Sequence, residues 1–185
     1  LDHLSRGRVG WNIVTGYLDS AAKAMGLTEQ VEHDRRYDQA DEYLAVLYKL
    51  WEGSWEDGAV VNDAQARVYA QPGKVHKVEH HGEFYQVEGY HLCEPSPQRT
   101  PVLFQAGSSD RGLLFAGRHA ECVFISGQNK ASTQVQVAKV RASAVDAGRN
   151  PNDIKVFMGL NVIVGATEAA AWAKHAEYLS YASAE

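Results

Sequence analysis

Cysteine is scarce in this chain of 185 residues, and the two that occur, Cys93 and Cys122, fit no C-x-x-C pattern. Two widely separated cysteines do not form a disulfide framework and are typical of a reduced, cytoplasmic protein. No apolar run approaches the ~20 residues that a membrane-spanning helix needs. No signal peptide is visible at the start of the sequence. We therefore expect a cytoplasmic protein without a membrane span.

Positive charge is also in short supply, with 18 Lys and Arg residues against 23 Asp and Glu residues and a net charge of −5. The basic residues form no stripe or cluster, which argues against nucleic-acid binding. Three familiar motifs are absent: the phosphate loop GxxxxGK[ST], the dinucleotide fingerprint GxGxxG and the hydrolase elbow GxSxG. The hydrophobic fraction of 45% is sufficient for one sizeable core, so we expect one domain over residues 1–185.

Short apolar runs alternate with helical patterns along much of the chain. Residues 1–6 resemble the tail of a helix, and residues 16–32 a loop with some helical character. The expected strands are 8–15, 101–105, 121–125 and 154–164, and the expected helices are 38–52, 110–118, 130–147 and 168–180. This alternation predicts an α/β fold built from four parallel βα units, about half of a (β/α)8 TIM barrel. An open doubly wound sheet is the alternative that periodicity leaves open.

Residues 53–100 lack helical periodicity and are interpreted as an irregular insertion. Residues 75–87 contain two strand-like runs around His81 and Gly82, which favours a hairpin. In this region His76, His80 and His81, together with Cys93, raise the question of a metal site. His80 and His81 are adjacent and point in different directions in a strand, and no familiar ligand spacing is completed. We therefore predict no metal site.

The segment Gln105-Ala106-Gly107-Ser108-Ser109 stands where a predicted strand passes into a helix. Glycine allows a tight turn and close approach of a ligand, and a helix N-terminus with serine hydroxyls attracts anions such as phosphate. At this point the segment has two interpretations: an anion site, or a helix whose N-cap is Ser108 or Ser109.

Three further segments contain candidate binding residues. Asn12, near the end of the first strand, could bond a planar ligand or be a satisfied buried amide. His33 and Tyr37 lie four apart on one side of a helix, unless Asp34 caps that helix and leaves His33 exposed. Tyr17 could line a pocket, although aromatic residues more often belong to the core.

The strings WNIVTG, EHDRRYDQADEYL and FQAGSSDRG, in this order, resemble the bacterial-luciferase-like flavin monooxygenases. The branch they resemble contains nitrilotriacetate, dibenzothiophene-sulfone and long-chain alkane monooxygenases, and the similarity extends over the whole chain. It implies a (β/α)8 barrel of which this chain is an internal fragment. It also implies use of reduced FMN supplied by a separate NAD(P)H-dependent flavin reductase. Oxygen and FMNH2 would give a C4a-peroxyflavin that oxygenates a small organic substrate: an alkane, an organosulfur compound or an aminopolycarboxylate.

The resemblance also assigns roles to individual residues. Asn12 and Thr15 match the family's WNxVT strand end, expected near the isoalloxazine ring. His33 and Tyr37 match HDxRY, expected at the FMN phosphate or ribityl chain. Gly107, Ser108 and Ser109 match QAGxS, expected at the phosphate. Tyr17 and Asn12 are the candidates for contact with the reacting region.

The sequence departs from the family at two positions. Many relatives have Ser in place of Gly16, and the alkane enzyme has His in place of Tyr17, which puts alkane specificity in doubt. Two alternatives to a monooxygenase are a deazaflavin-dependent oxidoreductase on the same barrel and a non-catalytic flavin-binding relative. The full-length protein is expected to be a homo-oligomer.

Overall fold

The computed structural model describes residues 1–182 and shows a four-stranded parallel sheet in the order β1-β6-β7-β8. The sheet strands are β1 (Gly10–Ile13), β6 (Val102–Gln105), β7 (Cys122–Ile125) and β8 (Lys155–Met158). The helices are α1 (Asp2–Ser5), α2 (Asp19–Ala24), α3 (His33–Trp51), α4 (Asp110–His119), α5 (Lys130–Asp146) and α6 (Glu168–Ser180). The predicted alternation of parallel strands and helices is confirmed. No helix in the described part of the chain is long and apolar enough to cross a membrane.

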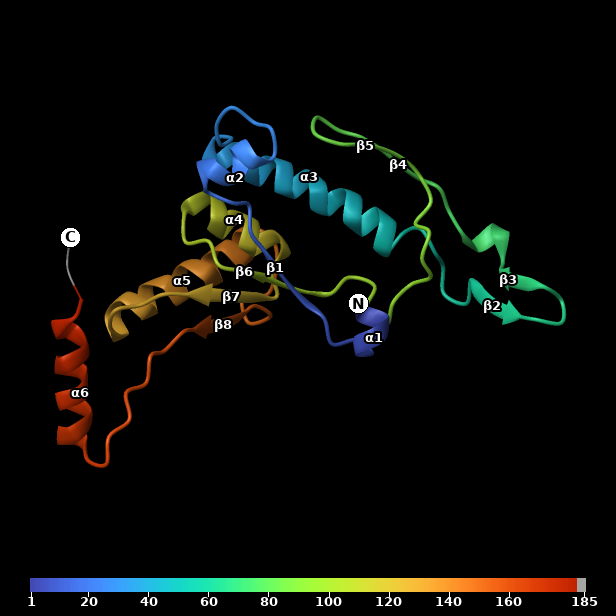
Figure 1. Ribbon diagram of the computed structural model, residues 1–185. Helices are drawn as coiled ribbons and strands as arrows, with labels where there is room; N and C mark the ends of the chain where they lie inside the picture. The colour runs from blue at the N-terminus through green and yellow to red at the C-terminus, as the bar shows by residue number, and fades with distance from the viewer. Residues whose placement is uncertain (183–185) are drawn as a thin grey trace.

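Helices α3, α4 and α5 cover one face of the sheet, as Figure 1 shows. One core cluster joins α3 and α4 to β1 and β6, and contains Ile13, Tyr37, Leu44, Leu103 and Phe115. A second joins α4 and α5 to β7, and contains Ala116, Ala120, Val123, Val140, Ala144 and Ile154. Each large aliphatic or aromatic side chain buried in this way contributes about 1.5–3 kcal/mol to folding. The two clusters fix how α3 and α4 sit over the ends of the strands.

The opposite face of the sheet is not covered by any described helix. Phe104, Phe124 and Phe157, from β6, β7 and β8, form an aromatic cluster in which every pair of ring centroids is 5.6–6.1 Å apart. Phe124 and Phe157 are each more than two-fifths exposed. In a (β/α)8 barrel the face without helices is the barrel interior, where bulky side chains fill the core.

Between α3 and β6 the chain leaves the sheet and forms two antiparallel hairpins (Figure 1). The elements are β2 (Val60–Asp63), β3 (Val68–Ala70), the short 3-10 helix η1 (Pro72–Lys74), β4 (Val78–His81) and β5 (Gln86–Gly89). The hairpin predicted around His81 and Gly82 is confirmed as β4–β5, ending two residues later than expected. The β2–β3 hairpin was not predicted, because its strands are short, exposed and without regular alternation.

Two predicted boundaries were wrong. Helix α3 begins at His33 instead of 38, because Glu32 caps it by accepting a hydrogen bond from the Arg35 amide. Those first residues are polar, so the apolar period does not reveal them, and Asp34 is not the cap. Strand β8 ends at Met158 instead of 164: β8 is an edge strand, and Leu160 beyond it is 72% exposed.

Candidate functional site

The candidate site lies where β1 and β6 end side by side. Register pairs Ile13 with Gln105, the last residues of the two strands. Helix α3 begins over this same end of the sheet (Figure 1). A cavity of about 220 Å³ opens there, and its lining residues are Ile13, Val14, Thr15, Gly16, Tyr17, His33, Arg36, Tyr37, Gln105, Ala106 and Gly107. In (β/α)8 barrels the carboxyl ends of the strands carry the active site.

The turn after β6 is packed directly against Tyr37. Gln105 is 2% exposed; its Nε2 donates to the Tyr37 hydroxyl at 3.2 Å, and its Oε1 accepts from the Gly107 amide at 2.7 Å. A Cβ at Gly107 would lie 2.4 Å from both Gln105 Nε2 and the Tyr37 hydroxyl. Glycine is therefore required at this position by the close approach of the turn to α3.

Ser109 takes one of the two roles that the sequence presented as alternatives. It is the N-cap of α4, and its Oγ accepts a hydrogen bond from the Gly112 amide at 3.0 Å. The same oxygen lies 3.2 Å from Nε2 of His33. A hydroxyl and an imidazole thus meet at a helix N-terminus, where unpaired N–H groups and the helix dipole favour an anion. Ser108 lies elsewhere, lining a cavity between α4 and α5.

His33 is oriented by its neighbour. Its Nδ1 lies 2.6 Å from Oδ1 of Asp34, so Nδ1 carries a proton toward that carboxylate. Nε2 then either accepts from Ser109 or, in the charged ring, is a second donor at the site. The exposed groups Glu32, His33 and Asp34 bring potential metal-ligand atoms within 4.8 Å of one another, but Glu32 is engaged as the cap and Asp34 with His33. The other histidines raised above have protein partners, such as Glu56 for His76 and Gln86 for His81.

Arg36 is a site residue that the sequence patterns did not single out. It lines the cavity with His33 and Tyr37, and its guanidinium donates to the Val31 carbonyl. Its Nε is buried and has no hydrogen-bond partner among the described residues. The sequence does not show which of the two arginines of HDRRY faces the site. Successive residues of a helix point about 100° apart, so Arg36 reaches the cavity while Arg35 pairs with Glu83 on another side of α3.

The remaining predicted residues lie in β1 or directly after it, and they do not all reach the cavity. Thr15 and Tyr17 follow the strand and line the cavity, although Tyr17 is 77% exposed. Asn12 alternates with buried Ile13 and therefore lies on the uncovered face, next to Phe104. Asn12 is exposed on this face, which is the interior side in a complete (β/α)8 barrel, so both interpretations of Asn12 stay predictions. The structure does not bring Asn12 into the cavity with His33.

A charged cluster holds α3 and α4 together behind the site. Arg111 bonds Asp38 at 2.9 Å and Asp41 at 2.6 Å, and its guanidinium lies 5.5 Å from the centre of the Tyr37 ring. Asp41 also accepts from His119 at 2.8 Å. Burial alone would raise the pKa of Asp41, but the hydrogen bonds from His119 and Arg111 hold that pKa below its usual value.

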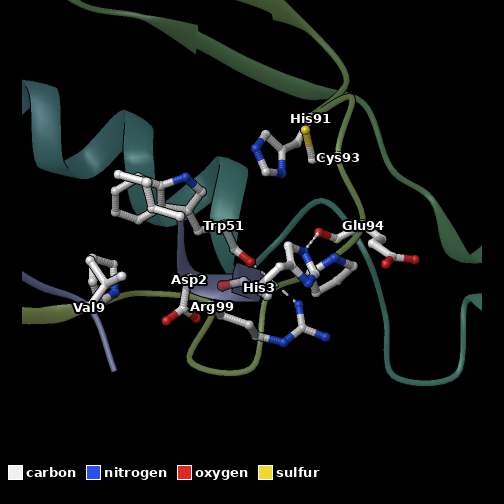
Figure 2. Close-up of a pocket in the computed structure, with 12 residues that line it drawn as sticks. Asp2, His3, Val9, Trp51, His91, Cys93, Glu94 and Arg99 are labelled. Atoms are coloured by element: carbon white, nitrogen blue, oxygen red, sulfur yellow. Dashed lines mark hydrogen bonds between the residues drawn. The ribbon is translucent and has the colours of Figure 1, made fainter. Parts of the chain in front are cut away.

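A second cavity, of about 280 Å³, lies at the opposite end of the strands and is shown in Figure 2. Asp2, His3, Trp51 and Arg99 contribute to its wall. Burial opposes ionisation of Asp2, yet hydrogen bonds from Gln98 lower the pKa of its carboxyl group to about 2. This cavity adjoins Val9, which precedes β1, and is therefore at the amino ends of the strands. Active sites of (β/α)8 barrels lie at the carboxyl ends of the strands, so the candidate site is the cavity lined by His33 and Tyr37.

Comparison with known proteins gives one family and several close relatives. The family model described as luciferase-like monooxygenase matches residues 1–185. The chain is 52% identical over its whole length to the long-chain alkane monooxygenase of Geobacillus thermodenitrificans, and it is also 52% identical to the dimethyl-sulfide monooxygenase of Hyphomicrobium sulfonivorans. It spans 42% and 38% of the lengths of these relatives.

Solved structures agree with the sequence comparison. A crystal structure of a long-chain alkane monooxygenase matches with a TM-score of 0.91 at 52% identity, over 98% of this chain and 42% of that one. A riboflavin lyase solved with modified FMN and riboflavin matches with a TM-score of 0.90 at 46% identity, over 97% of this chain and 40% of that one. The predicted partial (β/α)8 barrel of this family is confirmed. An F420-dependent secondary alcohol dehydrogenase, at 19% identity and a TM-score of 0.62, shares the fold alone.

Proposed function

The chain belongs to the luciferase-like monooxygenase family, and on that basis we propose that the full-length protein is an FMNH2-dependent monooxygenase. A separate NAD(P)H-dependent flavin reductase supplies the reduced flavin, and O2 and a small organic substrate are the other reactants. The observation that carries the proposal is the contact of Ser109 with His33 at the N-terminus of α4, 3.2 Å apart. It joins the two segments that the resemblance assigns to the flavin: HDxRY, expected at the FMN phosphate or ribityl chain, and QAGxS, expected at the phosphate.

The residues around the cavity fit a phosphate monoester. The free N–H groups of α4 and the Ser109 hydroxyl supply neutral donors. Arg36 supplies a cation with a buried, unpaired Nε, and His33 supplies a second donor when its ring is protonated. Because Gly107 has no side chain, the backbone of the turn can approach the ligand closely. We assign these residues, together with Tyr37, to the FMN phosphate.

The remaining candidates are assigned to the flavin beyond its phosphate. Thr15 and Tyr17 line the same cavity at the end of β1, and Asn12 lies on the uncovered face of that strand. Bound reduced flavin supplies the electrons and the oxygen chemistry, while the protein binds and orients it and keeps water from the reacting centre. Tyr17 and Asn12 are the side chains proposed to contact that centre.

The first test is an anaerobic titration of the full-length protein with reduced FMN and with reduced riboflavin, which lacks the phosphate. We expect FMNH2 to bind more tightly, and Arg36→Met to remove most of that preference by removing the cation. Equal affinities for the two flavins would refute the phosphate assignment. Reduced deazaflavin in the same titration tests the alternative cofactor, and its tighter binding would replace our proposal.

The second test measures turnover. With a flavin reductase and FMN, the full-length protein should consume O2 above the reductase-only rate when an oxidisable substrate is added. The relatives supply the panel: long-chain alkanes, dimethyl sulfide, dibenzothiophene sulfone and nitrilotriacetate. Binding of FMNH2 without oxygenated product from a broad panel would favour the non-catalytic alternative.

A further inference from the structure

Helix α3 presents two different faces over its first three turns. His33 and Tyr37, four residues apart, face the turn after β6. Arg35, Gln39 and Glu42 face the β4–β5 hairpin, which runs beside α3 in Figure 1. The hairpin therefore contacts the same short stretch of helix that carries the proposed phosphate ligands, from the other side.

Glu42 is the centre of the contact between hairpin and helix. Its carboxylate accepts hydrogen bonds from the amides of Phe84 at 3.0 Å and Tyr85 at 2.8 Å, and it pairs with Nε2 of His80 at 3.0 Å. The His80 and Glu42 side chains are only 12% and 14% exposed. Burial would raise the pKa of Glu42, but the bonds from Phe84 and His80 keep it below its usual value. Glu42 is therefore ionised at neutral pH and holds the hairpin turn by charge-assisted hydrogen bonds.

Gly82 allows this close approach. A Cβ at Gly82 would lie 1.9 Å from Glu42 Oε1 and 2.6 Å from His80 Nε2. Any side chain at this position would thus be forced against the Glu42–His80 pair and push the turn away from α3. Gly82, which marked the hairpin in the sequence, and the neighbouring His80 therefore have a role in packing the hairpin against α3.

Further contacts extend from this centre toward the start of α3. Arg35 makes a bidentate pair with Glu83, and its guanidinium lies 4.4 Å from the centre of the Phe84 ring. Gln39 Nε2 donates to the Tyr85 hydroxyl at 3.0 Å. Planar stacking and bidentate pairing orient an arginine more closely than a single charge contact does. The hairpin turn is thus attached within one turn of His33.

The first turn of α3 needs such support because it has no buried apolar residue. The buried residues of α3 are Tyr37, Leu44 and Val46, so none precedes Tyr37. Helix ends fray when tertiary packing does not hold them. On the helix side of the sheet, the turn is held by the His33–Ser109 contact and the Glu32 cap.

We propose that the β4–β5 hairpin, attached through Glu42, is a positioning element that holds the start of α3 so that His33 and Arg36 meet the phosphate-binding turn after β6. This inference rests on the proposed function, since the ligand it serves is the FMN phosphate. The hairpin does not touch the ligand. It acts by restricting the α3 residues that do, and pre-organised residues bind a ligand more tightly because less ordering is needed on binding.

The test uses the full-length protein and the affinities of reduced FMN and reduced riboflavin, measured anaerobically so that no oxygenation follows. Glu42→Gln removes the charge, and Gly82→Ala forces the turn from the helix. We expect each variant to lower FMN affinity about five- to tenfold, within the range of coupling between distinct parts of a protein. Riboflavin affinity should stay unchanged, so the preference for FMN falls.

Glu88→Gln is the matched control. Glu88 lies on the same hairpin but pairs with Lys77 and makes no bond to α3, so the FMN preference should equal that of the unaltered protein. If Glu42→Gln and Gly82→Ala lower only the thermal stability, or weaken both flavins equally, the hairpin is merely structural and the inference is overturned. Should Gly82→Ala fail to fold, Glu42→Gln decides alone. Absence of any FMN preference in the unaltered protein would instead contradict the proposed function.

Discussion

Gly107→Ala should disrupt the contact between Tyr37 and the turn after β6. The new Cβ would lie 2.4 Å from Gln105 Nε2 and from the Tyr37 hydroxyl, well inside contact distance. Gln105 is buried, and both ends of its side-chain amide are hydrogen-bonded: Nε2 donates to the Tyr37 hydroxyl, and Oε1 accepts from the Gly107 amide. The side chain cannot move away without leaving an amide group unpaired in the core.

The size of the effect follows from these contacts. Loss of the Gln105–Tyr37 hydrogen bond with a buried donor left unsatisfied costs about 1–3 kcal/mol. Steric displacement of the packed turn adds about 1 kcal/mol or more. Replacing glycine by alanine restricts the unfolded chain and returns about 0.4–1 kcal/mol. We therefore expect a net destabilisation of about 1–3 kcal/mol, together with weaker FMN binding because the turn carries Ser109.

Urea unfolding of the full-length protein, with anaerobic flavin titration, measures both effects. Gly89→Ala is the matched control, because a Cβ at Gly89 meets nothing within 4 Å. In a Tyr37→Phe background, which removes the hydroxyl, Gly107→Ala should cost less, with a coupling of about 1 kcal/mol. Equal unfolding free energies and flavin affinities for Gly107→Ala and Gly89→Ala would refute the reasoning.

Two other predictions concern the cap and the charged cluster. Ser109→Ala should cost about 1 kcal/mol in unfolding free energy by loss of the N-cap. It should also weaken FMN more than riboflavin in the anaerobic titration, and unchanged FMN affinity would count against a phosphate site. Because hydrogen bonds lower the pKa of Asp41, its stabilisation is complete above the unfolded value of about 3.9 and is lost as pH falls through the folded value. The urea concentration at the unfolding midpoint should therefore decrease when the pH is lowered beneath about 4. Asp41→Asn should cost about 1–3 kcal/mol in unfolding free energy at pH 7 and should weaken this dependence on pH. An identical pH profile in the variant would exclude Asp41 as a cause.

The sequence predicted the sheet and its helices because these depend on local patterns. Apolar runs of strand length and helical periodicity located all four parallel strands and four of the helices, and the strand-to-helix turn at Gln105–Ser109 was recognised from its glycine and serines. The predicted ends of helices and strands were less accurate where strand pairing or helix capping determines them. The start of α3 depends on the Glu32 cap, and the end of β8 on its edge position.

Only the tertiary structure decided which side chains meet. Ser109 and His33 are 76 residues apart, and Gln105 and Tyr37 are 68 apart; both contacts follow from the parallel register of β1 with β6 and the packing of α3 over their ends. The orientation of α3 points Arg36 into the cavity and Arg35 toward the hairpin. The sequence alone does not show which of these adjacent arginines faces the cavity. By itself the sequence determined the strands, the helices and the residue types available for binding an anion, because these depend on near neighbours. The site forms only where segments remote in the sequence come together, and the packing of the helices on the sheet sets the distances between them.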